Sequence, residues 1–162
     1  MSEIDRLLAG NRAHAAAYAN AHDKHPSRRV AVLTCMDTRI DVLAALGLQL
    51  GEAHVLRNAG ARVTEDVLRS LALSTHALGV DTVVVMQHTQ CGLAGGTDEA
   101  LREQTGADLA FLPITDHADA LRADVDQLAS TPYLGLVQAI AGLLYDVETG
   151  EVTEVVRWER PS

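Results

Sequence analysis

Two short apolar runs, both rich in β-branched residues, end at side chains that bind soft metal ions. Residues 30–34 lead directly into Cys35, and residues 82–87 lead into His88, with Cys91 three positions further on. Such runs are typical of buried strands. Because ligands gather in the crevice beyond the carboxyl ends of parallel strands, two neighbouring strands could aim these three side chains at one point.

The rest of the chain alternates between helical and strand-like patterns. Alternating β and α units predict an α/β fold: a mainly parallel central sheet flanked by helices, with a C-terminal antiparallel strand or hairpin. The turn residues between the last two strands favour the hairpin. We expect helices at residues 4–21, 40–48, 64–78, 98–103 and 117–129, and further strands at 53–57, 140–147 and 152–158.

Length and hydrophobicity predict a single domain over residues 1–162. The chain has 162 residues, of which 48% are hydrophobic, enough for a substantial core. Residues 1–25 form the expected N-terminal helical arm. Its apolar positions would have little to cover if the arm stood alone, which predicts that it packs on a partner subunit.

The cysteines allow several interpretations. The chain has two, and they could be buried small side chains, a redox pair or a disulfide. Zinc is favoured because each cysteine lies at a predicted strand end, and Cys91 shares its loop with His88 at a spacing that lets both reach one ion. A structural zinc normally takes four Cys or His ligands, whereas a catalytic zinc keeps about three and an open position. We therefore predict Zn²⁺ held by Cys35, His88 and Cys91.

Asp37 and Arg39 follow Cys35 at alternate positions. If the chain stays extended there, both side chains reach the same side of the crevice, and a carboxylate pairs bidentately with a guanidinium. Such a pair can orient a proton acceptor beside the metal. An ordinary surface ion pair is the alternative, and it would stabilise little. Asp37 could also fill the fourth coordination position, because a carboxylate oxygen is an acceptable zinc ligand.

Charge and hydropathy exclude several classes of partner. The formal net charge is −9, which argues against binding to nucleic acid or to an anionic membrane. The first residues carry no basic segment leading into a long apolar stretch, and no apolar run approaches the span of a bilayer. We therefore expect a soluble, cytoplasmic protein, in a reducing compartment that keeps both thiols unpaired.

The combination Cys-x-Asp-x-Arg and His-x-x-Cys, with Arg57-Asn58-Ala59-Gly60 between them, resembles the β-class carbonic anhydrases from about residue 30 to residue 93. This resemblance implies a zinc enzyme that reversibly hydrates carbon dioxide to bicarbonate and a proton by zinc-bound hydroxide. It also implies a homodimer or a dimer of dimers, with an N-terminal helix packed on the partner. By residue, it implies Cys35, His88 and Cys91 as zinc ligands, Asp37 and Arg39 as the catalytic dyad, Asp37 as fourth ligand in a closed state, and Asn58 and Gly60 as substrate-binding residues.

The sequence departs from the larger, plant-like members of that family. Many of them carry a substrate-contacting glutamine shortly before the first strand, where this chain has residues 25–29, and asparagine at the position of Ala61. The chain looks most like the compact bacterial subgroup, whose relatives include carbonyl sulfide hydrolases. Two alternative functions therefore stay open: hydrolysis of carbonyl sulfide or carbon disulfide on the same scaffold, and a non-catalytic zinc- or bicarbonate-binding module.

Overall fold

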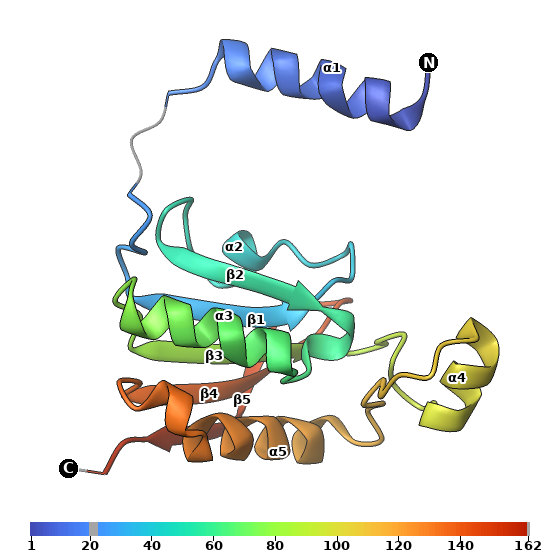
Figure 1. The fold of residues 1–162 in the computed structure, drawn as a ribbon, viewed down its shortest axis with the longest axis vertical. Coiled ribbons are helices and arrows are strands. Elements are labelled where there is room, and N and C mark those ends of the chain that lie inside the picture. Colours follow the sequence, from blue (N-terminus) through green and yellow to red (C-terminus); the bar gives the residue numbers. More distant parts are fainter. Residues whose placement is uncertain (20–22, 162) are drawn as a thin grey trace.

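A five-stranded sheet in the order β2-β1-β3-β4-β5 runs through the computed structural model, which describes residues 1–19 and 23–161 (Figure 1). The first four strands are parallel to their neighbours, and β5 is antiparallel to β4. The predicted mainly parallel sheet with a C-terminal hairpin is confirmed. The strands are β1 (Val30–Cys35), β2 (Ala53–Asn58), β3 (Thr82–His88), β4 (Ala139–Tyr145) and β5 (Val152–Glu159).

The helices lie where the sequence predicts them, with different ends. The predicted helix 40–48 is shorter, because Asp41 caps the Ala44 N–H at its start and Gly47 adopts a φ of +62° just past its end. The helices are α1 (Glu3–Ala16), α2 (Val42–Ala45), α3 (Glu65–His76), α4 (Asp98–Thr105) and α5 (His117–Ser130), with 3₁₀ turns η1 (Ala59–Ala61) and η2 (Pro132–Leu134).

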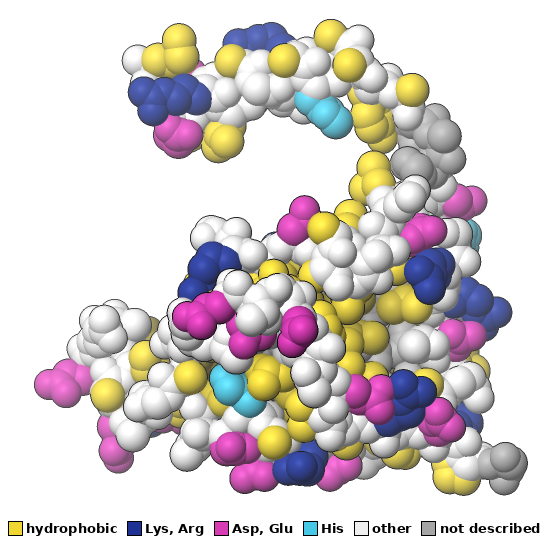
Figure 2. All heavy atoms as spheres, turned by 180° about the vertical axis from the view of Figure 1, so that it is seen from behind, with side chains coloured by type: hydrophobic (Ala, Val, Ile, Leu, Met, Phe, Trp, Pro, Cys, Tyr) yellow, Lys and Arg dark blue, Asp and Glu magenta, His cyan; other side chains and the backbone are white. Residues whose placement is uncertain are grey.

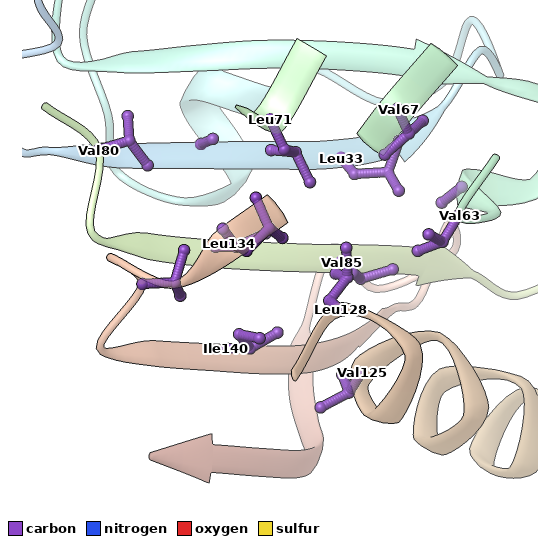
Figure 3. Packing of buried hydrophobic residues seen from close by; sticks show 14 of the residues in the cluster. Leu33, Val63, Val67, Leu71, Val80, Val85, Val125, Leu128, Leu134 and Ile140 are labelled. Carbon is purple, nitrogen blue, oxygen red and sulfur yellow. The ribbon is translucent and has the colours of Figure 1, made fainter. Parts of the chain in front are cut away.

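Helices α3 and α5 cover one face of the sheet and enclose the larger part of the core (Figures 1 and 3). Along β3, Val85 points into this cluster, whereas its neighbour Met86 points to a second cluster on the opposite face. The central strands are therefore buried on both sides, which is why β1 and β3 read as continuous apolar runs. The second cluster also contains Cys35, at the end of β1, and Cys91, in the loop after β3, so both cysteines lie in packed surroundings.

A buried ion pair ties α5 to the segment after η1. Arg62 Nε donates to Asp124 Oδ2 at 2.8 Å, and the two side chains are 13% and 3% exposed. Arg62 also donates to the carbonyl of Leu112 at 2.7 Å, and Gln87, next to His88, donates to Asp124 at 3.5 Å. Sequence reasoning missed this network, because its members lie far apart in the chain and no local pattern pairs them.

Replacing Asp124 with alanine is expected to destabilise the protein by about 3–5 kcal/mol, since it leaves a buried guanidinium without its counter-charge. Urea unfolding of both proteins measures the difference. The exposed Asp126 of the same helix is the matched control, and Asp126→Ala is expected to stay within about 0.5 kcal/mol of wild type. Equal stability of the two variants would contradict the assignment.

Helix α1 stands apart from the sheet (Figures 1 and 2). A capping box between Ser2 and Asp5 starts it, and none of its residues is buried. Its apolar side chains Ile4, Leu7 and Leu8 are 69%, 67% and 54% exposed. The predicted helix 4–21 is too long: α1 ends at Ala16, because Ala17 leaves the helical conformation with a φ of −108° and a ψ of 1°, and residues 20–21 lie outside the described part of the chain. Among the described residues, no helix has the length and apolar character needed to cross a membrane.

Candidate metal centre

The loops that follow β1 and β3 bring the predicted ligands together. Cys35 is the last residue of β1, His88 is the last of β3, and Cys91 lies in the loop beyond it. Because β1 and β3 are hydrogen-bonded neighbours in the sheet, their carboxyl ends lie side by side. The ligand atoms of the three residues are all within 4.8 Å of one another, and all three residues are buried.

The donor set fits a tetrahedral metal ion. His88 Nε2 is buried and has no hydrogen-bond partner among the described residues, while Nδ1 donates to the carbonyl of Thr89 at 2.8 Å, which leaves Nε2 free as a ligand atom. The Cys35 and Cys91 sulfur atoms are 4.0 Å apart, and both thiols are free. Two sulfur ligands at about 2.3 Å from one tetrahedral ion would lie about 3.8 Å apart, so little movement is needed.

Backbone N–H groups support both sulfur atoms. Gly60 donates to Cys35 Sγ at 3.3 Å, and Leu93 donates to Cys91 Sγ at 3.5 Å. Gly60 has a φ of +73°, which favours glycine, and a Cβ there would meet the end of the Leu93 side chain at 2.6 Å and require it to move. Burial raises the pKa of the Cys91 thiol, an effect that the bond from Leu93 opposes. A cation between the two sulfur atoms would favour their deprotonation.

Asp37 and Arg39 form a dyad beside the ligand group. Arg39 Nε donates to Asp37 Oδ1 at 2.9 Å, and Nη2 donates to Oδ2 at 2.7 Å. Hydrogen bonds from Arg39 hold the pKa of the Asp37 carboxyl well below its usual range. The chain does not stay extended here: residues 38–39 form a turn, because Asp37 Oδ1 also accepts the Arg39 backbone N–H at 2.9 Å, and the two side chains pair across it. Asp37 Oδ2 lies 3.8 Å from His88 Nε2.

Arg57, at the end of the edge strand β2, fixes this turn from the outside. Its guanidinium donates to the carbonyls of Cys35 at 2.8 Å, Asp37 at 2.5 Å and Ile40 at 3.2 Å. Asp37 and Ile40 lie outside the strands and helices, and Arg57 supplies hydrogen-bond donors to their carbonyls. The sequence showed Arg57 only as part of a motif, and the bracing contacts became visible with the fold.

Of the two predicted substrate-binding residues, Gly60 lines the cavity beside the ligand group and Asn58 does not. This cavity has a volume of about 510 Å³. The Asn58 side chain instead braces the backbone of Arg62, accepting its N–H at 3.0 Å and donating to its carbonyl at 2.7 Å. The cavity lining is mostly small or apolar and comes from three loops, residues 35–39, 59–60 and 91–93. Such a cavity suits a small, weakly polar molecule.

The fold and this group of side chains define a class of protein: an α/β protein whose candidate metal centre lies at the carboxyl ends of its parallel strands. A family model described as carbonic anhydrase matches residues 30–131. β-Carbonic anhydrase 1 of Mycobacterium tuberculosis is 35% identical over 161 residues, which cover 96% of this chain and 99% of that protein. The chain belongs to the β-carbonic anhydrase family, and carbonic anhydrases are lyases.

Two further relatives are informative. The crystal structure of the carbonic anhydrase of Streptococcus mutans has a TM-score of 0.86 and 42% identity, covering 96% of this chain and 99% of that one. A carbon disulfide hydrolase of Acidithiobacillus thiooxidans is 31% identical over 153 residues, or 78% of this chain and 76% of that protein. The scaffold is thus shared by proteins named for two different substrates.

Proposed function

We propose that this protein reversibly hydrates carbon dioxide to bicarbonate and a proton, with Zn²⁺ held by Cys35, His88 and Cys91. One observation carries the proposal: a buried imidazole nitrogen, to which no described residue hydrogen-bonds, lies within 4.8 Å of two free thiols and next to an ion-paired carboxylate. The two sulfur ligands and one nitrogen ligand suit zinc. A cytoplasmic location is part of the proposal, since reducing conditions keep these thiols available.

Bound at this site, zinc would supply an acidified water, whose pKa is about 7 in the three-histidine carbonic anhydrases. Asp37 accepts a hydrogen bond from the attacking oxygen and so orients it. Arg39 holds the carboxylate at the right place and keeps it ionised. The apolar lining around Gly60 and Leu93 admits carbon dioxide and limits competing water.

Asp37 has a second proposed role as the fourth ligand of a closed state. In the described structure its carboxylate is bound to Arg39, with Oδ2 3.8 Å from His88 Nε2. A rotation of the Asp37 side chain toward the ligand group would exchange Arg39 for the metal. Because the open position is where the reaction takes place, this closed state would be inactive.

Hydrolysis of carbon disulfide or carbonyl sulfide is the second candidate, favoured by the similarity to a carbon disulfide hydrolase over 78% of the chain. Both are linear molecules like carbon dioxide, and the same attacking oxygen would serve. A non-catalytic zinc- or bicarbonate-binding module is less favoured, because the Asp37–Arg39 dyad is intact.

Parallel assays decide among these functions. Stopped-flow hydration of carbon dioxide and sulfide release from carbon disulfide and carbonyl sulfide are measured on one preparation containing about one zinc per chain. We expect carbon dioxide to be the preferred substrate. Faster sulfide release would favour the second candidate, and inactivity on all three substrates with zinc bound would leave the binding module.

We further propose that α1 packs on a second copy of the chain, giving a homodimer or a dimer of dimers. Its exposed apolar side chains, Ile4, Leu7 and Leu8, would be covered there. Deleting residues 1–25 is expected to weaken self-association by at least about tenfold, the effect of losing one buried leucine-sized side chain. Light scattering over a range of concentrations measures it.

The control for this deletion is Arg6→Ala, which changes an exposed charged side chain of the same helix. That variant is expected to associate like wild type. A deletion variant with unchanged association would contradict the role of α1.

A further inference from the structure

Gln90, between His88 and Cys91, has an unusual backbone conformation for its residue type. Its φ is +55°, in the left-handed region, which residues other than glycine seldom adopt and which asparagine tolerates better than glutamine. Such conformations persist where surrounding contacts fix them, and they gather at functional sites. The contacts of Gln90 explain why this residue is held there.

Gln90 binds the edge of the Arg39 guanidinium next to the edge that pairs with Asp37. Arg39 Nη1 donates to Gln90 Oε1 at 3.2 Å, and Nη2 donates to the Gln90 carbonyl at 3.1 Å. The bonds to Asp37 use Nε and Nη2. The guanidinium is therefore fixed on two sides, and Gln90 ties it to the loop that carries two of the proposed metal ligands.

Gln90 is itself anchored by Glu148, which lies in the turn between β4 and β5. Gln90 Nε2 donates to Glu148 Oε1 at 2.7 Å. A charged acceptor strengthens this bond compared with a neutral one. The Gln90 amide oxygen accepts from Arg39 and the amide nitrogen donates to Glu148. These two hydrogen bonds determine the orientation of the amide group.

We propose that Gln90, anchored by Glu148, is a positioning residue for the Asp37–Arg39 dyad. The inference rests on the proposed function of the same site. A rotation of Asp37 toward the metal position breaks its bonds to Arg39, while Gln90 keeps the guanidinium in place as the partner to which Asp37 returns. Gln90 thus favours the arrangement in which Asp37 stays on Arg39 and the open metal position is left to the reaction.

The first test uses Gln90→Asn, Glu148→Ala and the double variant in the full chain loaded with zinc. Asparagine accepts the positive φ, but its shorter side chain cannot span Arg39 and Glu148. We expect kcat for carbon dioxide hydration to fall by about tenfold or more in Gln90→Asn, the lower end of the effect of one lost hydrogen bond to a charged group, with KM little changed. The double variant should be no slower than Gln90→Asn, since both changes act on one chain of contacts.

Glu151→Ala is the matched control, because Glu151 is an exposed carboxylate near the same turn and makes no side-chain hydrogen bond to Gln90 in the described structure. It should keep the wild-type kcat. If Gln90→Asn fails to fold, Gln90→Gly replaces it, since glycine also accepts a positive φ and removes the same contacts.

The second test follows the Arg39 Nε–H proton by NMR in ¹⁵N-labelled protein, with Arg39→Lys assigning the signal. This proton bonds to Asp37, so faster exchange with water in Gln90→Asn is expected. Unchanged exchange, a wild-type kcat, or additive losses in the double variant would each overturn the role of Gln90. If the wild-type protein does not hydrate carbon dioxide, the proposed function is overturned. The role of Gln90 is then still tested by the exchange rate of the Arg39 Nε–H proton, which does not depend on activity.

Discussion

Replacing Cys91 with serine is expected to remove the metal and, with it, carbon dioxide hydration. Cys35 and His88 would be left as an incomplete ligand pair, since a serine hydroxyl is a poor ligand for zinc at neutral pH. In zinc enzymes, replacing a residue that only hydrogen-bonds a ligand already lowers metal affinity about 10–100-fold. Losing a ligand itself should therefore lower the zinc affinity by more than about 100-fold. Competition with a chromophoric chelator measures the affinity, and elemental analysis measures the zinc content.

His117→Asn is the control for metal content. This imidazole is near His88 but outside the ligand group, and its Nδ1 bonds to Gln87 at 2.9 Å. Its removal is expected to leave one zinc per chain. Full metal occupancy and activity in Cys91→Ser would contradict the proposed centre, whatever the behaviour of the control.

The strands and the ligand group were predictable because they depend on local patterns. Both β1 and β3 are buried on two faces, and such strands read as uninterrupted apolar runs. Since parallel neighbours end at the same edge of a sheet, a ligand at each strand end is enough to predict a shared site. Cys35, His88 and Cys91 meet both conditions, and the structure brings them together.

The contacts around the dyad were not predictable in the same way. The turn at residues 38–39 depends on a side-chain bond from Asp37 to the backbone, and the bracing by Arg57 depends on β2 lying beside β1. The bond between Gln90 and Glu148 joins residues 58 positions apart. Periodicity reports which side of an element is buried, but it carries no information on which distant polar partners will meet.

The dyad also determines which single substitution should separate catalysis from metal binding. Asp37 is placed outside the ligand group, so its loss leaves Cys35, His88 and Cys91 intact. Because bonds from Arg39 hold its pKa well below the usual range, the wild-type carboxylate is ionised throughout the neutral range. It is therefore always available as an acceptor and as a competitor for the open metal position.

Asp37→Ala is accordingly expected to keep its zinc and to lower turnover by a factor on the order of 10² or more, the lower range for losing a positioned acid–base partner. The competition at the open position disappears with the carboxylate, so a crystal structure at acidic pH should show no protein ligand in the fourth position.

Arg39→Ala leaves Asp37 unrestrained and should instead shift the site toward the closed state, with Asp37 on the metal. Stopped-flow hydration and zinc analysis of both variants measure these effects. Wild-type turnover in Asp37→Ala would reduce Asp37 to a structural carboxylate that holds Arg39 and nothing more.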